Sequence, residues 1–181
     1  IGNLQVKNLK LNAINAKLAA AGGKLTVAPL TLNLYEGSAN GSLAVNANDN
    51  SFSIKQSLSN IRINPLLKDL ADKDLLEGRG SVTLDLATAG PNVAALKRAL
   101  GGSASINLKD GALKGINLAQ SLRDLKSKLG AGASTTTQEA KEAKAGEKTD
   151  FSEFTASFKI VRGVAHNEDL TLKSPFCLLY T

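Results

Sequence analysis

Hydrophobic and polar residues alternate along much of the chain, with the two-residue period of strands that are buried on one face. The clearest examples are Val82 to Leu86 and Ala104 to Leu108, where every second side chain is apolar. The same pattern recurs at 25–34, 38–47 and 154–160, and glycine, asparagine or proline separates the stretches. The chain is therefore predicted to be mainly β, forming a large curved antiparallel sheet or a sandwich.

Three short stretches have the 3.6-residue period of a helix instead. The first begins at Asn64-Pro65, where Asn64 is the predicted N-cap, and the second runs from Val93 to Leu100. The third runs from Asn117 to Leu129, and its leucines fall on one face: Leu118, Leu122, Leu125 and Leu129. We expect about three short helices, packed on a face of the sheet or closing one end of it.

Local motifs add detail to the predicted sheet. Asp110-Gly111 predicts a tight hairpin turn, with a return strand beginning at Ala112. Pro29 has no amide proton for a ladder, so it predicts a bulge or an edge. A Gly-Ser step leads into a strand three times, at Gly41-Ser42, Gly80-Ser81 and Gly102-Ser103. The uneven spacing of these steps excludes a solenoid of fixed period.

The 181 residues are enough for a single domain, which we expect to span 1–181. Within it, 130–149 has no apolar side chain larger than alanine, so we expect a flexible loop there. The sequence contains no apolar run of about 18 residues, which predicts neither a signal peptide nor a membrane span. We expect the chain to be a fragment that is truncated at its C-terminus.

Charge and composition narrow the choice of partner. The formal net charge is +6, but the basic residues are spread along the chain, and only 4% of residues are aromatic. Lysines on a sheet surface also protect its edges from pairing with other chains. We therefore favour a solvated surface over attraction to anionic lipid, and we expect no nucleic-acid partner because few side chains could stack on bases.

The candidates for chemistry are sparse. His166 is the only histidine and Cys177 the only cysteine, so neither has the companions that a metal site or a catalytic pair requires. The acidic residues Asp69, Asp72, Asp74 and Glu77 lack the spacing of a calcium loop and are interleaved with cations. We expect no catalytic residue, no metal and no cofactor, and therefore no enzyme.

The third predicted helix allows two interpretations. Its leucines, with Lys126 nearby, suit contact with lipid or with a partner: Leu118, Leu122, Leu125 and Leu129. The same stripe also suits a helix packed on its own sheet, which we favour, because a single-layer sheet must cover its apolar face.

Several motifs, taken together and in order, resemble the C-terminal conserved domain of the AsmA family. They are Pro29-Leu30 to Gly37, Leu66 to Leu70, Leu76 to Gly80, Gly90 to Leu96, Gly102 to Leu118 and Gly163 to Leu170. The resemblance implies a Gram-negative envelope protein, anchored in the inner membrane by an N-terminal helix, with this domain in the periplasm. Family members are linked to outer-membrane assembly and look like relatives of β-sheet groove proteins thought to move phospholipids. The family offers no catalytic or ligand motif to transfer to this chain.

From this resemblance we expect a non-enzymatic module for outer-membrane assembly and homeostasis. It would contact phospholipid or a membrane surface, or pass phospholipid along an apolar β-sheet groove. The alternative is a structural or protein-interaction domain that assists outer-membrane protein assembly through contacts with assembly proteins. The sequence leaves the lipid, the direction of transport and the oligomeric state open.

Overall fold

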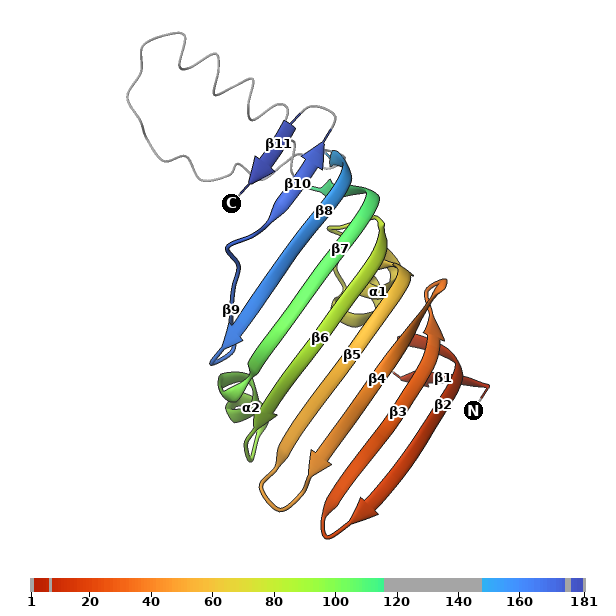
Figure 1. Ribbon diagram of the computed structural model, residues 1–181, viewed down its shortest axis with the longest axis vertical. Coiled ribbons are helices and arrows are strands. Elements are labelled where there is room, and N and C mark those ends of the chain that lie inside the picture. The colour runs from red at the N-terminus through yellow and green to blue at the C-terminus, as the bar shows by residue number, and fades with distance from the viewer. Residues whose placement is uncertain (1, 7, 116–147, 175–176, 181) are drawn as a thin grey trace.

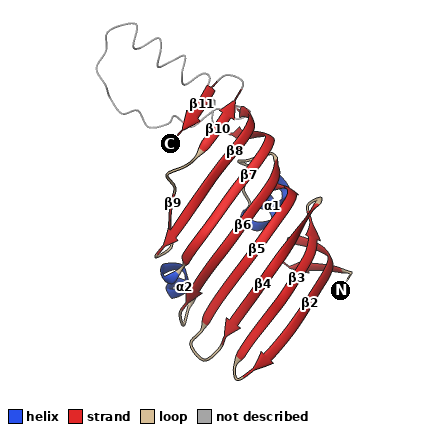
Figure 2. Ribbon diagram, in the orientation of Figure 1, coloured by secondary structure: helices blue, strands red, loops and turns tan. Residues whose placement is uncertain are grey.

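The computed structural model describes residues 2–6, 8–115, 148–174 and 177–180. These residues form one open, twisted antiparallel sheet of eleven strands with two helices (Figure 1). The described part of the chain therefore adopts the large-sheet alternative and not the sandwich. Both helices lie in connections between strands, at opposite ends of the sheet (Figure 2).

Strand order in the sheet follows chain order, except that β9 pairs with β8 outside the main path. The strands are β1 (Asn3–Val6), β2 (Leu9–Ala21), β3 (Lys24–Leu34), β4 (Gly37–Asn46), β5 (Ser51–Arg62), β6 (Arg79–Ala89), β7 (Gly101–Lys114), β8 (Lys148–Val161), β9 (Val164–His166), β10 (Thr171–Ser174) and β11 (Cys177–Tyr180). Because every paired strand is antiparallel, all turns and helical connections lie at one of two ends of the sheet.

Alternation predicted the strands well, but the predicted hairpin at Asp110-Gly111 is wrong. Strand β7 runs straight through both residues, and Gly111 pairs with Phe151 of β8. Asp110 does take a positive φ of 48°, as a turn would require, but one such residue fits inside a strand. Gly111 is needed for close packing, since a Cβ there would lie 2.1 Å from the Glu77 carbonyl oxygen.

The two described helices are α1 (Ile63–Ala71) and α2 (Val93–Ala99). Helix α2 is capped by Asn92, whose side chain accepts a hydrogen bond from the Ala95 amide. Helix α1 begins one residue before the predicted position and has Arg62 as its N-cap. Asn64 is not the cap, because its amide donates instead to Asp74 across the following loop.

The third predicted helix, from Asn117 to Leu129, lies outside the described residues. So does most of the predicted loop at 130–149, although its last two residues, Lys148 and Thr149, belong to β8. The sequence interpretation of this region remains a prediction.

The hydrophobic core lies between α1 and one end of the sheet, where α1 packs behind β5 and β6 (Figure 1). Ile61 and Leu108 are completely buried there, and Ile63 of α1 is 3% exposed. The other buried members come from β3, β4, β5, β8 and β10: Leu34, Ala39, Leu58, Phe151 and Leu172. A single short helix thus buries the end of the sheet on which it packs.

The repeated Gly-Ser steps now have a structural explanation. A Cβ added to Gly41, Gly80 or Gly102 would lie about 2 Å from a carbonyl oxygen of the neighbouring strand. Glycine at each step therefore permits close approach of adjacent backbones. Pro29 marks a bulge, as predicted, because the pairing of β3 with β4 shifts register between Val27 and Leu30.

Candidate functional site

The two faces of the sheet differ in chemistry because paired residues on adjacent strands point to the same side. On one face the registers align apolar side chains into rows that cross β3 to β8. One row consists of Val27, Leu43, Ile54, Leu86, Gly102 and Ile160. A second row consists of Leu32, Ala39, Leu58, Val82, Ile106 and Ala156. We call this surface the apolar face.

Burial falls along the apolar face with distance from α1. Near the helix, Leu58 is 7% exposed and Leu108 is fully buried. Towards the other end of the strands, the apolar side chains are only partly buried: Leu43, Ile54, Leu84, Leu86, Phe158 and Ile160. No second layer covers this part of the face among the described residues. The apolar face is therefore closed at the α1 end and open towards the opposite end.

Gln56 is a polar residue within the apolar rows, in register with Gly41 and Leu84. Its Oε1 is buried and has no hydrogen-bond partner in the described part of the chain. A buried acceptor without a partner costs free energy, so its retention here needs a reason.

The opposite face is polar. Its rows carry serine, threonine and charged residues, as in the row formed by Lys55, Asp85, Ser103 and Lys159. Lys55 and Asp85 form an ion pair of 2.9 Å, and the hydroxyls of Thr83 and Ser105 lie 2.5 Å apart. This face needs no covering layer.

Polar contacts hold α1 over the end of the sheet. The Tyr35 hydroxyl, from the β3–β4 turn, donates to Asp69 of α1 at 2.7 Å. Burial of the phenol, followed in size by this hydrogen bond, raises the pKa of Tyr35 to about 12. The tyrosine therefore stays protonated, and it keeps donating to Asp69 at neutral pH.

A cluster of ion pairs ties the loop after α1 to β7. Lys114 of β7 contacts Asp74 at 2.8 Å and Glu77 at 2.6 Å, and Lys68 contacts Asp74 at 2.9 Å. Hydrogen bonds from Lys114, Lys68 and Asn64 hold the pKa of Asp74 well below its usual range. These carboxylates are engaged by cations, so their role in the described structure is to anchor α1.

The other sequence candidates are placed apart from one another. His166 lies exposed in β9, in register with Lys159, and Cys177 begins β11. No group of three metal-ligating side chains gathers in the described residues. The proposed contact residues Leu118, Leu122, Leu125, Lys126 and Leu129 lie outside the described residues, so the structure does not test them.

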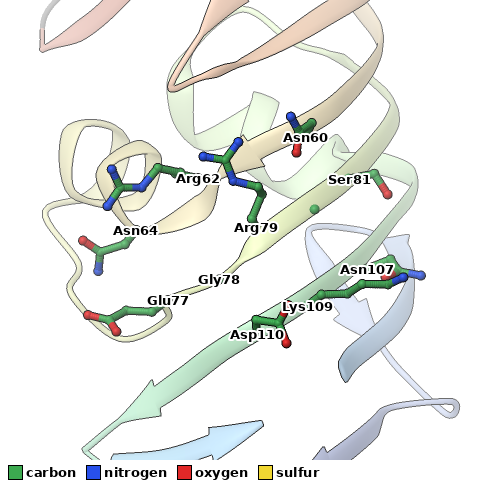
Figure 3. Close-up of a pocket in the computed structure, with 11 residues that line it drawn as sticks. Asn60, Arg62, Asn64, Glu77, Gly78, Arg79, Ser81, Asn107, Lys109 and Asp110 are labelled. Atoms are coloured by element: carbon green, nitrogen blue, oxygen red, sulfur yellow. The ribbon is translucent and has the colours of Figure 1, made fainter. Parts of the chain in front are cut away.

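A hollow of about 910 Å³ opens on the polar face near α1 (Figure 3). Its cations are Arg62, Arg79 and Lys109, which occupy one cross-strand row. Both arginines are hydrogen-bonded to Glu36, and the Arg62–Glu36 distance is 2.8 Å. An anionic ligand would have to compete with this carboxylate, so the hollow is a poorer candidate than the apolar face.

Sequence reasoning found the alternation but did not single out the residues of the open apolar face. The missing information is the register between strands, which decides which apolar residues stand next to one another. The Gly-Ser steps were the available signal, since each marks a close approach of neighbouring strands.

Comparison with known proteins places the chain in a family. The model of the AsmA family matches residues 1–170, which is nearly the whole chain. No curated protein and no solved structure matches. Among the described residues, no helix has the length and apolar character needed to cross a bilayer. The chain belongs to the AsmA family, which is associated with the cell envelope.

Proposed function

We propose that this domain is a non-enzymatic, periplasmic module of envelope biogenesis whose apolar face holds the acyl chains of phospholipid. The observation that carries this proposal is the open part of the apolar face, where aliphatic and aromatic side chains from six adjacent strands stay partly exposed. Exposed apolar surface of this extent is typical of a binding surface. Family membership in an envelope-associated family supports the same conclusion.

The dimensions of the face suit acyl chains. Six strands spaced about 4.8 Å apart give a surface roughly 24 Å wide. One leaflet of a bilayer core is about 15 Å thick, so an acyl chain fits within this width. The polar face of the sheet and the closed α1 end would then confine lipid to one side of the domain.

The test compares two aspartate substitutions at adjacent positions of β7. Ala104 stands on the apolar face between Leu84 and Phe158, whereas Ser103 stands on the polar face. Ala104→Asp places a carboxylate among acyl chains, so we expect at least roughly tenfold less cross-linking to a phospholipid that carries a photoreactive acyl chain. Ser103→Asp should cross-link as the wild-type chain does. Equal cross-linking by both variants, or none by the wild type, would refute the proposal.

A specific observation also favours the second candidate, an interaction domain in outer-membrane protein assembly. Strand β1 pairs only with Leu9 to Asn12 of β2, so the rest of β2 has no strand on that side in the described structure. Leu18 on this edge is 68% exposed. An extended segment of a partner could add to the edge by main-chain hydrogen bonds. Protection of Asn15 to Ala21 from hydrogen exchange by an outer-membrane protein peptide, without lipid binding, would favour this candidate.

A further inference from the structure

The end of the sheet opposite α1 carries an unusual combination of exposed side chains. Helix α2 and the β8–β9 hairpin lie side by side there (Figure 1), and the Gly163 amide donates to the Leu100 carbonyl at 2.8 Å. A Cβ on Gly163 would lie 2.2 Å from the Lys97 carbonyl oxygen, so the two segments are in direct contact. We call α2 with Lys159 to Val164 the tip.

The tip is cationic and has no compensating acid of its own. It carries Lys97, Arg98, Lys159 and Arg162, and the stretches 90–101 and 157–167 contain neither aspartate nor glutamate. All four side chains belong to exposed residues. Within the described residues, none of them forms an ion pair.

The α1 end of the sheet is the opposite in this respect. Apart from Lys55–Asp85, every ion pair of the described structure lies there, and the cations are matched by acids such as Glu36, Asp74 and Glu153. The positive charge of the chain that is not neutralised locally is therefore concentrated at the tip. Charge of one sign at one end of an elongated molecule orients that end towards an anionic surface.

Exposed aliphatic side chains lie among these cations. Val93 of α2 is 66% exposed, and Val161 and Val164 of the hairpin are 44% and 54% exposed. Valine contributes nothing to binding phosphate alone, but it gains free energy when it enters the interfacial region of a bilayer. Helix α2 has no aromatic residue for stacking on bases, so nucleic acid fits the tip less well.

We propose that the tip docks on the surface of a bilayer that contains anionic phospholipid. The four cations would contact lipid phosphates while the valines enter the headgroup region. The strand ends next to the tip carry Leu86 and Ile160, which belong to the open part of the apolar face. Docking at the tip therefore brings the open end of that face against the membrane. The inference goes beyond the acyl-chain proposal and does not depend on it.

The experiment measures flotation of the chain with phosphatidylcholine vesicles, with and without phosphatidylglycerol. The test variant is Lys97→Glu/Arg98→Glu/Arg162→Glu. The control is Lys10→Glu/Lys17→Glu/Lys73→Glu, which changes net charge equally at exposed lysines away from the tip. We expect the wild type to bind phosphatidylglycerol vesicles, less so at high salt, and the test variant to bind roughly tenfold or more weakly. The control should lose much less affinity.

A second variant, Val93→Ser/Val164→Ser, separates bilayer docking from simple attraction to a polyanion. It should lose vesicle binding while its affinity for a short oligonucleotide stays unchanged. Circular dichroism and thermal unfolding must match the wild type for every variant. Equal losses in the two charge-reversal variants, unchanged vesicle binding of the valine variant, or tip-dependent binding of the oligonucleotide alone would each overturn the inference.

The outcomes separate this inference from the acyl-chain proposal. Ala104→Asp should leave vesicle flotation unchanged, and the tip variant should still cross-link to a dispersed photoreactive phospholipid. Loss of cross-linking in Ala104→Asp together with normal tip behaviour would support both conclusions independently.

Discussion

Gln56 shows how a single side chain reports on the use of a whole surface. Its Oε1 is buried between apolar neighbours without a partner in the described residues, on the face that we assign to lipid. An apolar residue at this position would satisfy the fold better. The amide is therefore a stability cost that packing alone does not explain.

Replacement of Gln56 by leucine should stabilise the domain. Removing an unpaired buried acceptor and adding apolar contact should raise the free energy of unfolding by about 1–2 kcal/mol. Urea denaturation measures this change. Ser57→Leu, at the next position and on the polar face, serves as the control and should change stability by less than about 0.5 kcal/mol. A less stable Gln56→Leu variant would show that the amide makes a contact that holds the fold together.

At the scale of elements, α1 and its loop close one end of the apolar face through polar anchors. Asp74 accepts hydrogen bonds from three side chains, with the one from Lys114 the strongest influence on its pKa. The pKa of Asp74 in the folded chain lies below its ordinary value of 3.8. The resulting stabilisation is present above that pH and is lost as the pH falls through the lowered pKa.

The pH dependence of stability should therefore identify the Asp74 cluster. We expect the urea midpoint of the wild type to fall on acidification below about pH 4, since Asp74 then takes up a proton that the unfolded chain takes up more readily. Asp74→Asn should be less stable at neutral pH and should show a shallower fall. Asp72→Asn is the matched control, because Asp72 is exposed on the same loop and forms no ion pair in the described structure. A fall in Asp74→Asn as steep as in the wild type would contradict this assignment.

The sequence predicted most elements but not how they combine into a surface. The alternation from Val82 to Leu86 identified β6, and Asn92 with Val93 identified α2, because these signals are local. The dipeptide Asp110-Gly111 misled, since the same left-handed backbone serves a hairpin turn and a strand interior. The open part of the apolar face could not be predicted, because it depends on strand register and on where α1 packs.

For the whole molecule, two asymmetries coincide. The apolar face is closed by α1 at one end of the strands and open at the other. The charges are paired at the closed end, whereas the cations of the tip are not paired within the described residues. An open apolar surface next to a cationic tip is the arrangement expected of a domain that receives lipid from a membrane at one end.

Native mass spectrometry of the purified chain tests the central claim most directly, because it weighs any lipid that stays bound. The account predicts a second species, heavier than the bare chain by the mass of one or more phospholipids, which is reduced in Ala104→Asp and retained in Ser103→Asp. Detection of the bare chain alone, after both purification and incubation with phospholipid, would contradict the assignment of the apolar face to lipid.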